Sequence, residues 1–140
     1  MSRVVVDASV ALKWFVPEVH SVVARRLLRE GAELLAPDLI WAEVGNALWR
    51  KWRGGELAAE AVQGILADFR RMPLHIRSGE SLYDAAWPVA RILGRTFYDS
   101  LYLALALDAD CPLVTADLRF LNAVHDSRWG RHCLWVEDIA

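Results

Sequence analysis

Cysteine is scarce in this chain of 140 residues, which contains only Cys111 and Cys133. Small secreted domains usually carry more cysteines, arranged as a disulfide framework, and the low count argues against one here. Each cysteine lies within or beside an apparent core strand. We therefore expect two buried free thiols and a protein of the reducing cytoplasm.

The sequence also lacks a long uninterrupted apolar run. Residues 4–16 are mostly apolar, but Asp7 and Lys13 interrupt them and no small-residue cleavage site follows. A membrane span needs about 20 nearly continuous apolar residues. We therefore expect neither a signal peptide nor a membrane helix.

No large excess of one charge is present, because the formal net charge is only −2. Nucleic-acid binding would therefore have to depend on local basic clusters. Three such clusters occur: Arg25, Arg26 and Arg29; Arg50, Lys51 and Arg53; and Arg91 and Arg95. Cations near helix C-termini also complement the helix dipole, so we assign no single arginine to RNA.

The composition is that of a globular protein, with 55% apolar and 24% charged residues. The length favours a single domain over residues 1–140. Short apolar runs predict strands at 3–6, 33–36, 74–76, 112–115 and 133–136. Helices are expected at 8–15, 18–30, 37–53, 57–71, 80–93 (kinked by Pro88), from Asp99 through the apolar run 101–107, and at 118–124. This alternation predicts an α/β fold with a mostly parallel sheet of four to five short strands and helices on both faces.

Three aspartates stand at the ends of these elements. Asp7 follows the first strand, Asp117 follows the fourth, and Asp99 begins the buried helix. Ligands of parallel α/β sheets bind beyond the carboxyl ends of the strands, so Asp7 and Asp117 would be neighbours if their strands are adjacent. Aspartate is also a favoured helix cap, and each of the three has this simpler explanation.

Glu43 lies at the edge of the apolar stripe predicted for the 37–53 helix, which is formed by Ile40, Val44, Ala47, Leu48 and Trp52. On an isolated helix it would be a border charge with its stem along the apolar surface, or a partner of Arg50. A carboxylate at the rim of a core is also where a metal site is built.

Asp7, Glu43, Asp99 and Asp117 together would place about four negative charges in one cleft, which a cation must offset. Carboxylate oxygens select hard ions, so Mg²⁺ or Mn²⁺ is expected rather than zinc. The sequence lacks paired histidines at ligand spacing, a phosphate-binding glycine loop and a Gly-x-Ser-x-Gly elbow. The nucleophile would then be metal-activated water, and a phosphodiester is the natural substrate.

Four segments resemble the PIN-domain ribonucleases, and more narrowly the VapC-type toxins of toxin–antitoxin pairs. They are VVVDASV at 4–10, PDLIWAEVGNAL at 37–48, FYDSLYLALAL at 97–107 and LVTADLRFLNAV at 113–124. The resemblance covers essentially the whole chain, in order. It implies a PIN-like fold and an endoribonuclease that leaves a 5′ phosphate and a 3′ hydroxyl.

The resemblance also implies roles for individual residues. Asp7, Glu43, Asp99 and Asp117 match the acidic quartet that holds one or two Mg²⁺ or Mn²⁺ ions, and Ser9 and Thr115 match supporting hydroxyls. It further implies an RNA substrate, a homodimer and a cognate antitoxin whose C-terminal segment lies over the active-site groove.

Two other classes of function stay open on the residues alone. Phosphotransfer receivers and phosphatases also place acids at strand ends, although a haloacid-type phosphatase would need an aspartate where Ser9 stands. A non-catalytic PIN-like module that only binds RNA or protein is the other.

Trp49 lies opposite the apolar stripe of its helix, beside small residues. It could receive an antitoxin segment in a groove shared with Trp14, or it could be covered by a neighbouring helix.

Overall fold

The structure is a computed structural model that describes residues 2–29 and 31–139. Its strands are β1 (Arg3–Val6), β2 (Glu33–Pro37), β3 (Leu74–Arg77), β4 (Leu113–Thr115) and β5 (Cys133–Trp135). Its α-helices are α1 (Ala8–Leu12), α2 (Ser21–Ala24), α3 (Arg26–Arg29), α4 (Leu39–Arg53), α5 (Ala59–Arg70), α6 (Gly79–Leu93), α7 (Phe97–Ala109) and α8 (Leu118–His125). Two short 3₁₀ helices, η1 (Gly130–His132) and η2 (Val136–Asp138), flank β5.

The strands form one sheet in the order β3-β2-β1-β4-β5, and every neighbouring pair is parallel. The central strands are apolar and buried, as strands covered on both faces should be. This confirms the predicted α/β fold. The adjacency of β1 and β4 also meets the condition under which Asp7 and Asp117 become neighbours. From β1 the chain proceeds to β2 on one side of β1, while β4 lies on the other side. The carboxyl ends of β1 and β4 therefore form a topological switch point of the sheet.

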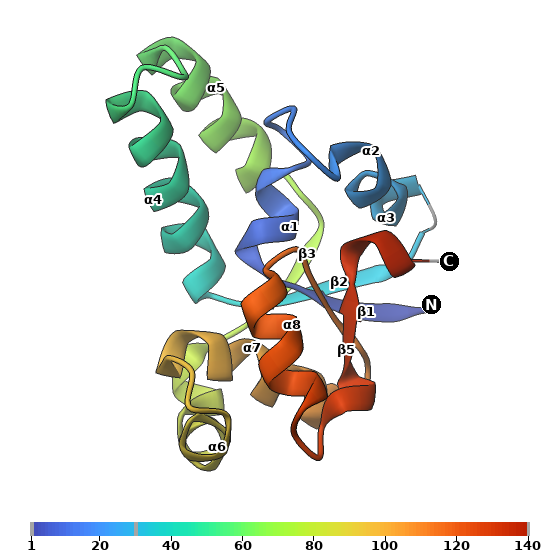
Figure 1. Ribbon diagram of the computed structural model, residues 1–140. Coiled ribbons are helices and arrows are strands. Elements are labelled where there is room, and N and C mark those ends of the chain that lie inside the picture. The colour runs from blue at the N-terminus through green and yellow to red at the C-terminus, as the bar shows by residue number, and fades with distance from the viewer. Residues whose placement is uncertain (1, 30, 140) are drawn as a thin grey trace.

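Helices cover both faces of the sheet (Figure 1). Helices α1, α4 and α5 lie on one side, and α6 and α7 lie on the other. Helix α7 packs against β1, β2 and β4, and each of its residues from Ser100 to Ala106 is buried. This confirms the prediction that the apolar run 101–107 is buried on several sides, although Leu107 itself is only partly buried.

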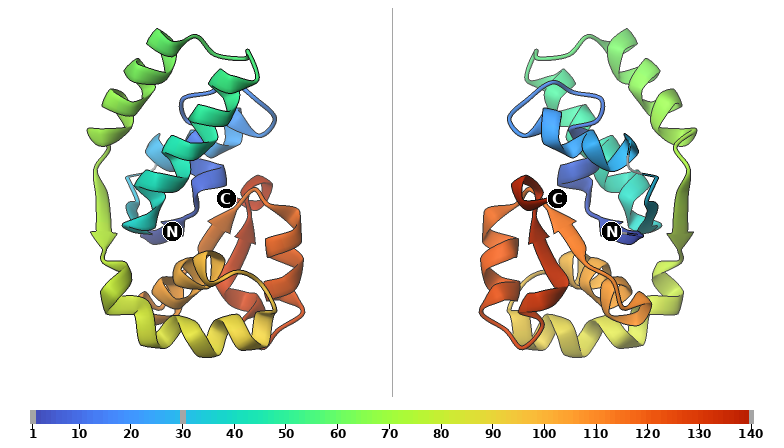
Figure 2. Two further views of the ribbon diagram at one scale, coloured as in Figure 1. Left: turned by 90° about the vertical axis from the view of Figure 1, so that its left-hand side faces the viewer. Right: turned by 90° about the vertical axis from the view of Figure 1, so that its right-hand side faces the viewer.

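Helices α4 and α5 lie side by side and extend away from the sheet (Figure 2). Ile40, Val44 and Leu48 form the buried stripe of α4 as predicted. The assignment of Trp52 to that stripe is wrong, because its position near the outer end of α4 leaves it 47% exposed. Trp49 is 48% exposed, so the idea that a neighbouring helix covers it is also wrong.

The predicted helix at 18–30 is two separate turns of helix. Helix α2 ends at Ala24 and α3 begins at Arg26, with Arg25 as the C-cap of α2 between them. The backbone of His20 has a positive φ, so a regular helix cannot begin as early as Glu18. Glu30, the predicted last residue, lies outside the described residues.

Most other boundaries agree with the predictions to within two residues. Helix α1 is shorter than expected, because the chain turns after Leu12 toward Phe15. Val136 belongs to η2 and not to the last strand. Helix α6 continues through Pro88 to Leu93. Cys111 and Cys133 are buried free thiols as predicted. Among the described residues, no helix has the length and apolar character needed to cross a membrane.

Candidate active site

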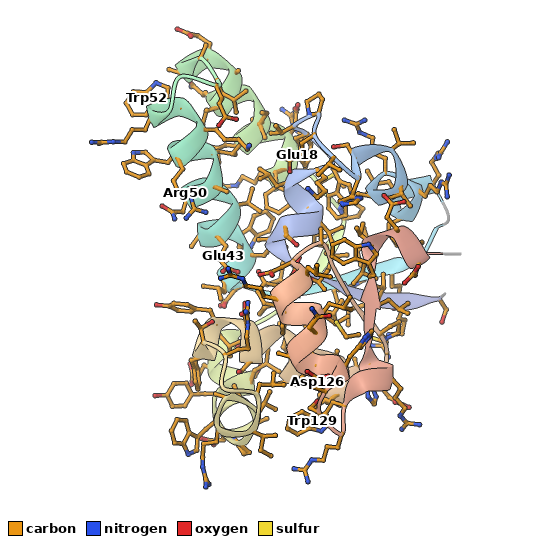
Figure 3. The ribbon with its side chains drawn as sticks, in the orientation of Figure 1. Glu18, Glu43, Arg50, Trp52, Asp126 and Trp129 are labelled. Carbon is orange, nitrogen blue, oxygen red and sulfur yellow. The ribbon has the colours of Figure 1, made fainter. Side chains whose placement is uncertain are left out.

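A cavity of about 330 Å³ opens at the carboxyl edge of β1 and β4. All four predicted acids line it: Asp7, Glu43, Asp99 and Asp117. They come from four separate places in the chain, namely the end of β1, the middle of α4, the first turn of α7 and the end of β4. Figure 3 shows Glu43 on α4, facing the centre of the molecule, with Arg50 farther along the same helix.

Asp7 is the most buried of the four acids, with 6% of its surface exposed. It is the N-cap of α1, because its Oδ1 accepts a hydrogen bond from the backbone N–H of Val10 at 3.2 Å. Oδ1 also accepts from the hydroxyl of Ser9, and Oδ2 accepts from Thr115 Oγ1 at 2.5 Å. Asp7 therefore caps α1 and lines the cavity at the same time.

Burial raises the pKa of Asp7 to about 6, and the nearby charge of Asp99 adds to the rise. Hydrogen bonds from Ser9 and Thr115 oppose this increase by stabilising the carboxylate. The hydroxyls of Ser9 and Thr115 also link the end of β1 to the end of β4 through hydrogen bonds. Ser9 Oγ accepts from the backbone N–H of Ala116, and Thr115 Oγ1 accepts from that of Asp117, each at 3.0 Å.

Glu43 accepts a hydrogen bond from the hydroxyl of Tyr102 at 2.7 Å between Oη and Oε1. Tyr102 is itself 1% exposed and comes from the buried face of α7. Partial burial raises the pKa of Glu43, and the charge of Asp99 raises it further, while the bond from Tyr102 lowers it. The border pair with Arg50 that we considered for Glu43 is not found among the described residues.

Asp99 does not cap its helix. Thr96 is the N-cap of α7, and its side-chain oxygen accepts from the backbone N–H of Asp99 at 3.1 Å. The carboxylate of Asp99 therefore has no capping duty and faces the cavity. Its Oδ2 accepts from Arg95 Nε at 3.0 Å. Burial raises the pKa of Asp99, Arg95 opposes this rise, and the charge of Asp117 adds to it.

Asp117 caps α8 with one oxygen and faces the cavity with the other. Its Oδ1 accepts from the backbone N–H groups of Arg119 at 3.0 Å and Phe120 at 3.2 Å. Its Oδ2 accepts from Arg95 Nη2 at 3.2 Å. Arg95 thus bridges Asp99 and Asp117.

The family model of the PIN domain matches residues 4–125. The chain belongs to the PIN domain family. Ribonuclease VapC3 of Pyrobaculum aerophilum is 35% identical over 119 residues, which cover 82% of this chain and 89% of that protein. At this identity and coverage, the chain falls in the VapC branch of the family.

Solved structures agree on the PIN fold. The crystal structure of PAE2754 from Pyrobaculum aerophilum superimposes with a TM-score of 0.72 at 25% identity, covering 96% of this chain and 84% of that one. A toxin–antitoxin complex from Klebsiella pneumoniae superimposes with a TM-score of 0.63 at 12% identity, covering 97% of this chain and 99% of that one.

VapC nucleases of the PIN family generally depend on a divalent metal, and the donor chemistry of this cavity fits such an ion. Its charged lining groups near β1 and β4 are carboxylates, the charge of Asp99 raises the pKa of Asp7 and of Glu43, and that of Asp117 raises the pKa of Asp99. No three Asp, Glu, His or Cys side chains in the described part of the PIN chain stand close enough together to hold one ion as they are positioned.

The side of the cavity formed by α4 carries one basic residue, Arg50, beside Glu43 and Ala47. Arg50 is exposed, and no ion pair of Arg50 occurs among the described residues. Glu18 also lines the cavity, but it is paired with Lys13 Nζ at 3.0 Å and Lys51 Nζ at 3.3 Å. These two lysines lower the pKa of Glu18 against the effect of its partial burial. Glu18 therefore belongs to a structural ion cluster between the loop after α1 and α4.

Trp14 does not share a groove with Trp49, contrary to our hypothesis. Trp14 is 6% exposed, and its indole N–H donates to the backbone carbonyl of Ala24 at 3.0 Å. It lines a separate cavity with Val22 and Arg25. The outer face of α4 therefore presents Trp49 without Trp14.

Proposed function

We propose that this protein is a metal-dependent endoribonuclease and the toxin of a type II toxin–antitoxin pair. The observation that carries the proposal is that four acids from four distant parts of the chain line one cavity at the switch point of the sheet. Family membership supports the same activity. The similarity to a named ribonuclease makes RNA the substrate class.

The proposed cofactor is Mg²⁺ or Mn²⁺, because an all-carboxylate set favours hard cations. When bound, such an ion neutralises charge on the scissile phosphate and lowers the pKa of a bound water. Asp7 and Asp99 are the proposed direct ligands. Asp117 completes the site through its Oδ2, directly or through a second ion or a water.

The remaining polar groups position these acids. Ser9 and Thr115 hold the carboxylate of Asp7 in one orientation by donating to its two oxygens. Tyr102 holds one oxygen of Glu43, which leaves the other free to accept a hydrogen bond from the attacking water. Because the pKa of Glu43 is raised, it is better suited than an ordinary glutamate to take a proton from that water.

RNA requires positive charge near the acids. Arg50 supplies it, since its side chain lines the same cavity and has no carboxylate partner among the described residues. We assign to Arg50 a contact with an RNA phosphate beside the cleaved bond, because guanidinium groups bind phosphates through two parallel hydrogen bonds.

The proposed protein partner is a cognate antitoxin, as in the structurally similar toxin–antitoxin complex. The exposed Trp49 of α4 is the proposed contact for an antitoxin segment. If Trp49→Ala leaves antitoxin affinity unchanged in a folded protein, this contact is wrong. We further propose that residues 1–140 form a single PIN domain, and that the protein is a homodimer located in the cytoplasm.

The test of the activity is cleavage of a mixed RNA population by the purified protein. We expect cleavage with Mg²⁺ or Mn²⁺, none with excess chelator, and restoration when metal is added back. Asp7→Asn should abolish cleavage, while Asp126→Asn, a matched change at an exposed residue outside the cavity, should not. Cleavage that survives chelator or Asp7→Asn would rule out the metal-dependent mechanism.

The toxin role needs a test in cells. Expression of the wild-type chain should arrest growth, and co-expression of the adjacent upstream gene should relieve the arrest. Expression of Asp7→Asn should leave growth normal. Arrest by a folded, cleavage-deficient variant would separate toxicity from the nuclease activity and contradict the proposal.

A further inference from the structure

Arg95 is held tightly between two of the four acids. Its Nε and Nη2 lie 3.0 and 2.9 Å from Asp99 Oδ2, and Nη2 lies 3.2 Å from Asp117 Oδ2. The carbon at the centre of its guanidinium lies 5.6 Å from the centre of the Phe120 ring, which is buried. About three quarters of the arginine side chain is covered. The guanidinium is therefore fixed between Asp99 and Asp117, two of the residues that line the cavity.

The oxygens that Arg95 occupies are those that a metal ion needs. Asp117 Oδ1 already accepts from two backbone N–H groups at the start of α8, so Oδ2 is its oxygen available to the cavity. Arg95 binds this oxygen. It also binds Oδ2 of Asp99, the acid next to Asp117 in the same wall.

The charge of Arg95 is permanent under physiological conditions, because a guanidinium does not lose its proton in proteins. It offsets the repulsion between Asp99 and Asp117, which is a function that a divalent ion would otherwise perform. No three acids converge in the described residues, and Arg95 stands between two of the four.

We propose that Arg95 is an intramolecular counter-ion that competes with the divalent metal for Asp99 and Asp117. The inference rests on the proposed metal-dependent function and adds a regulatory element to it. Metal binding requires the guanidinium to leave Asp117 Oδ2, so Arg95 lowers the metal affinity of the site. At the same time it stabilises the protein when metal is scarce.

The test is calorimetric titration of Mn²⁺ into the protein after treatment with chelator. Arg95→Gln should bind Mn²⁺ about tenfold more tightly than the wild type, since each ion pair that the metal must replace opposes binding. The matched control is Arg91→Gln, which removes the same charge from an exposed residue of α6 that contacts none of the four acids among the described ion pairs. Its affinity should stay within about twofold of the wild type.

Thermal unfolding supplies a second readout. Without metal, Arg95→Gln should melt a few degrees below Arg91→Gln, because Asp99 and Asp117 then repel each other without a counter-ion. Saturating Mn²⁺ should raise the melting temperature of Arg95→Gln by more than it raises that of the wild type. Arg95→Lys keeps the charge and should return the Mn²⁺ affinity toward that of the wild type.

The outcomes are distinguishable from those that test the nuclease. If the wild type binds Mn²⁺ and Arg95→Gln binds it equally or more weakly, Arg95 is not a competitor and this inference fails while the metal site stands. If none of the proteins binds Mn²⁺, the proposed metal site is wrong, and the inference about Arg95 is wrong as well.

Discussion

At the scale of single residues, Asp7 makes stability depend on pH. Its pKa in the folded protein is about 6, against 3.8 for an ordinary aspartate. The folded state therefore holds the proton more tightly than the unfolded state between these values, and the free energy of unfolding falls as the pH rises through them. A pKa difference of about two corresponds to roughly 3 kcal/mol at most.

Asp7→Asn should remove this dependence. Measured by urea unfolding in the presence of chelator, the stability of the variant relative to the wild type should rise by up to about 3 kcal/mol from about pH 4 to about pH 7. A constant difference between the two proteins across this range would show that Asp7 titrates normally and is better solvated than its burial implies.

Tyr102 offers a test of how Glu43 is positioned. Tyr102→Phe removes the hydroxyl that donates to Glu43, so we expect a loss of about 1 kcal/mol in stability and a several-fold lower kcat with an unchanged KM for RNA. Tyr98→Phe, at an exposed tyrosine of the same helix, should alter neither kcat nor KM. If Tyr102→Phe has the kcat of the wild type, the proposal that Tyr102 positions Glu43 for the attacking water is wrong.

The sequence predicted the acids of the site better than their partners. Asp7, Glu43, Asp99 and Asp117 were assigned together, and all four line one cavity. Arg95 and Tyr102 were missed, although they stand four residues before and three residues after Asp99. That spacing lies on one face of a helix. Arg95 precedes Thr96, the N-cap of α7, and so lies outside the helix, where helical periodicity could not link it to Asp99.

At the scale of elements, Pro88 is an exposed proline inside α6. Proline lacks the backbone N–H that the helix would use and crowds the preceding turn, at a cost of about 3 kcal/mol in a regular helix. Pro88→Ala should therefore raise the free energy of unfolding by about 1–3 kcal/mol in urea titrations. A loss of stability would mean that the packing of α6 against α7 depends on the shape that the proline imposes.

Element type was easier to predict than element length. Strong apolar periodicity marked α4 and α7 correctly, because burial in the core and helical spacing agree there. The segment 18–30 carried helix-forming residues but folded as two turns, α2 and α3. The side chain of Ser21 explains part of this, since it bonds the backbone at Val16 and Glu18 and folds the loop back onto α2. Such a local contact has no periodic signal in sequence.

At the scale of the whole molecule, the proposed RNA substrate is a polyanion, whereas the net charge of the protein is −2. The proposed contact with an RNA phosphate is made by Arg50, which lines the cavity. Arg50→Gln should raise KM for RNA several-fold and reduce the salt dependence of RNA binding by about one phosphate contact. The control is Arg71→Gln, an exposed arginine outside the cavity. Equal salt dependence for the wild type and Arg50→Gln, measured by fluorescence anisotropy, would contradict the assignment.

The parallel order of the sheet was predicted only in outline. Alternating strands and helices indicated a parallel sheet, but nothing in the strand sequences states that β4 lies beside β1. Helix α7 packs across β1, β2 and β4, and its apolar surface is buried against these three strands. This packing places Asp99 at the carboxyl edge of β1 and β4, beside Asp7 and Asp117 in the cavity lining.

The most direct test of one metal site built from four distant acids is Mn²⁺ binding followed by electron paramagnetic resonance, which detects the free ion. Titration of the chelator-treated wild type should reduce the free Mn²⁺ signal, and Asp7→Asn, Glu43→Gln, Asp99→Asn and Asp117→Asn should each weaken this binding. Asp126→Asn, an aspartate away from the cavity (Figure 3), should bind like the wild type. Unchanged binding in all four cavity variants would contradict the account.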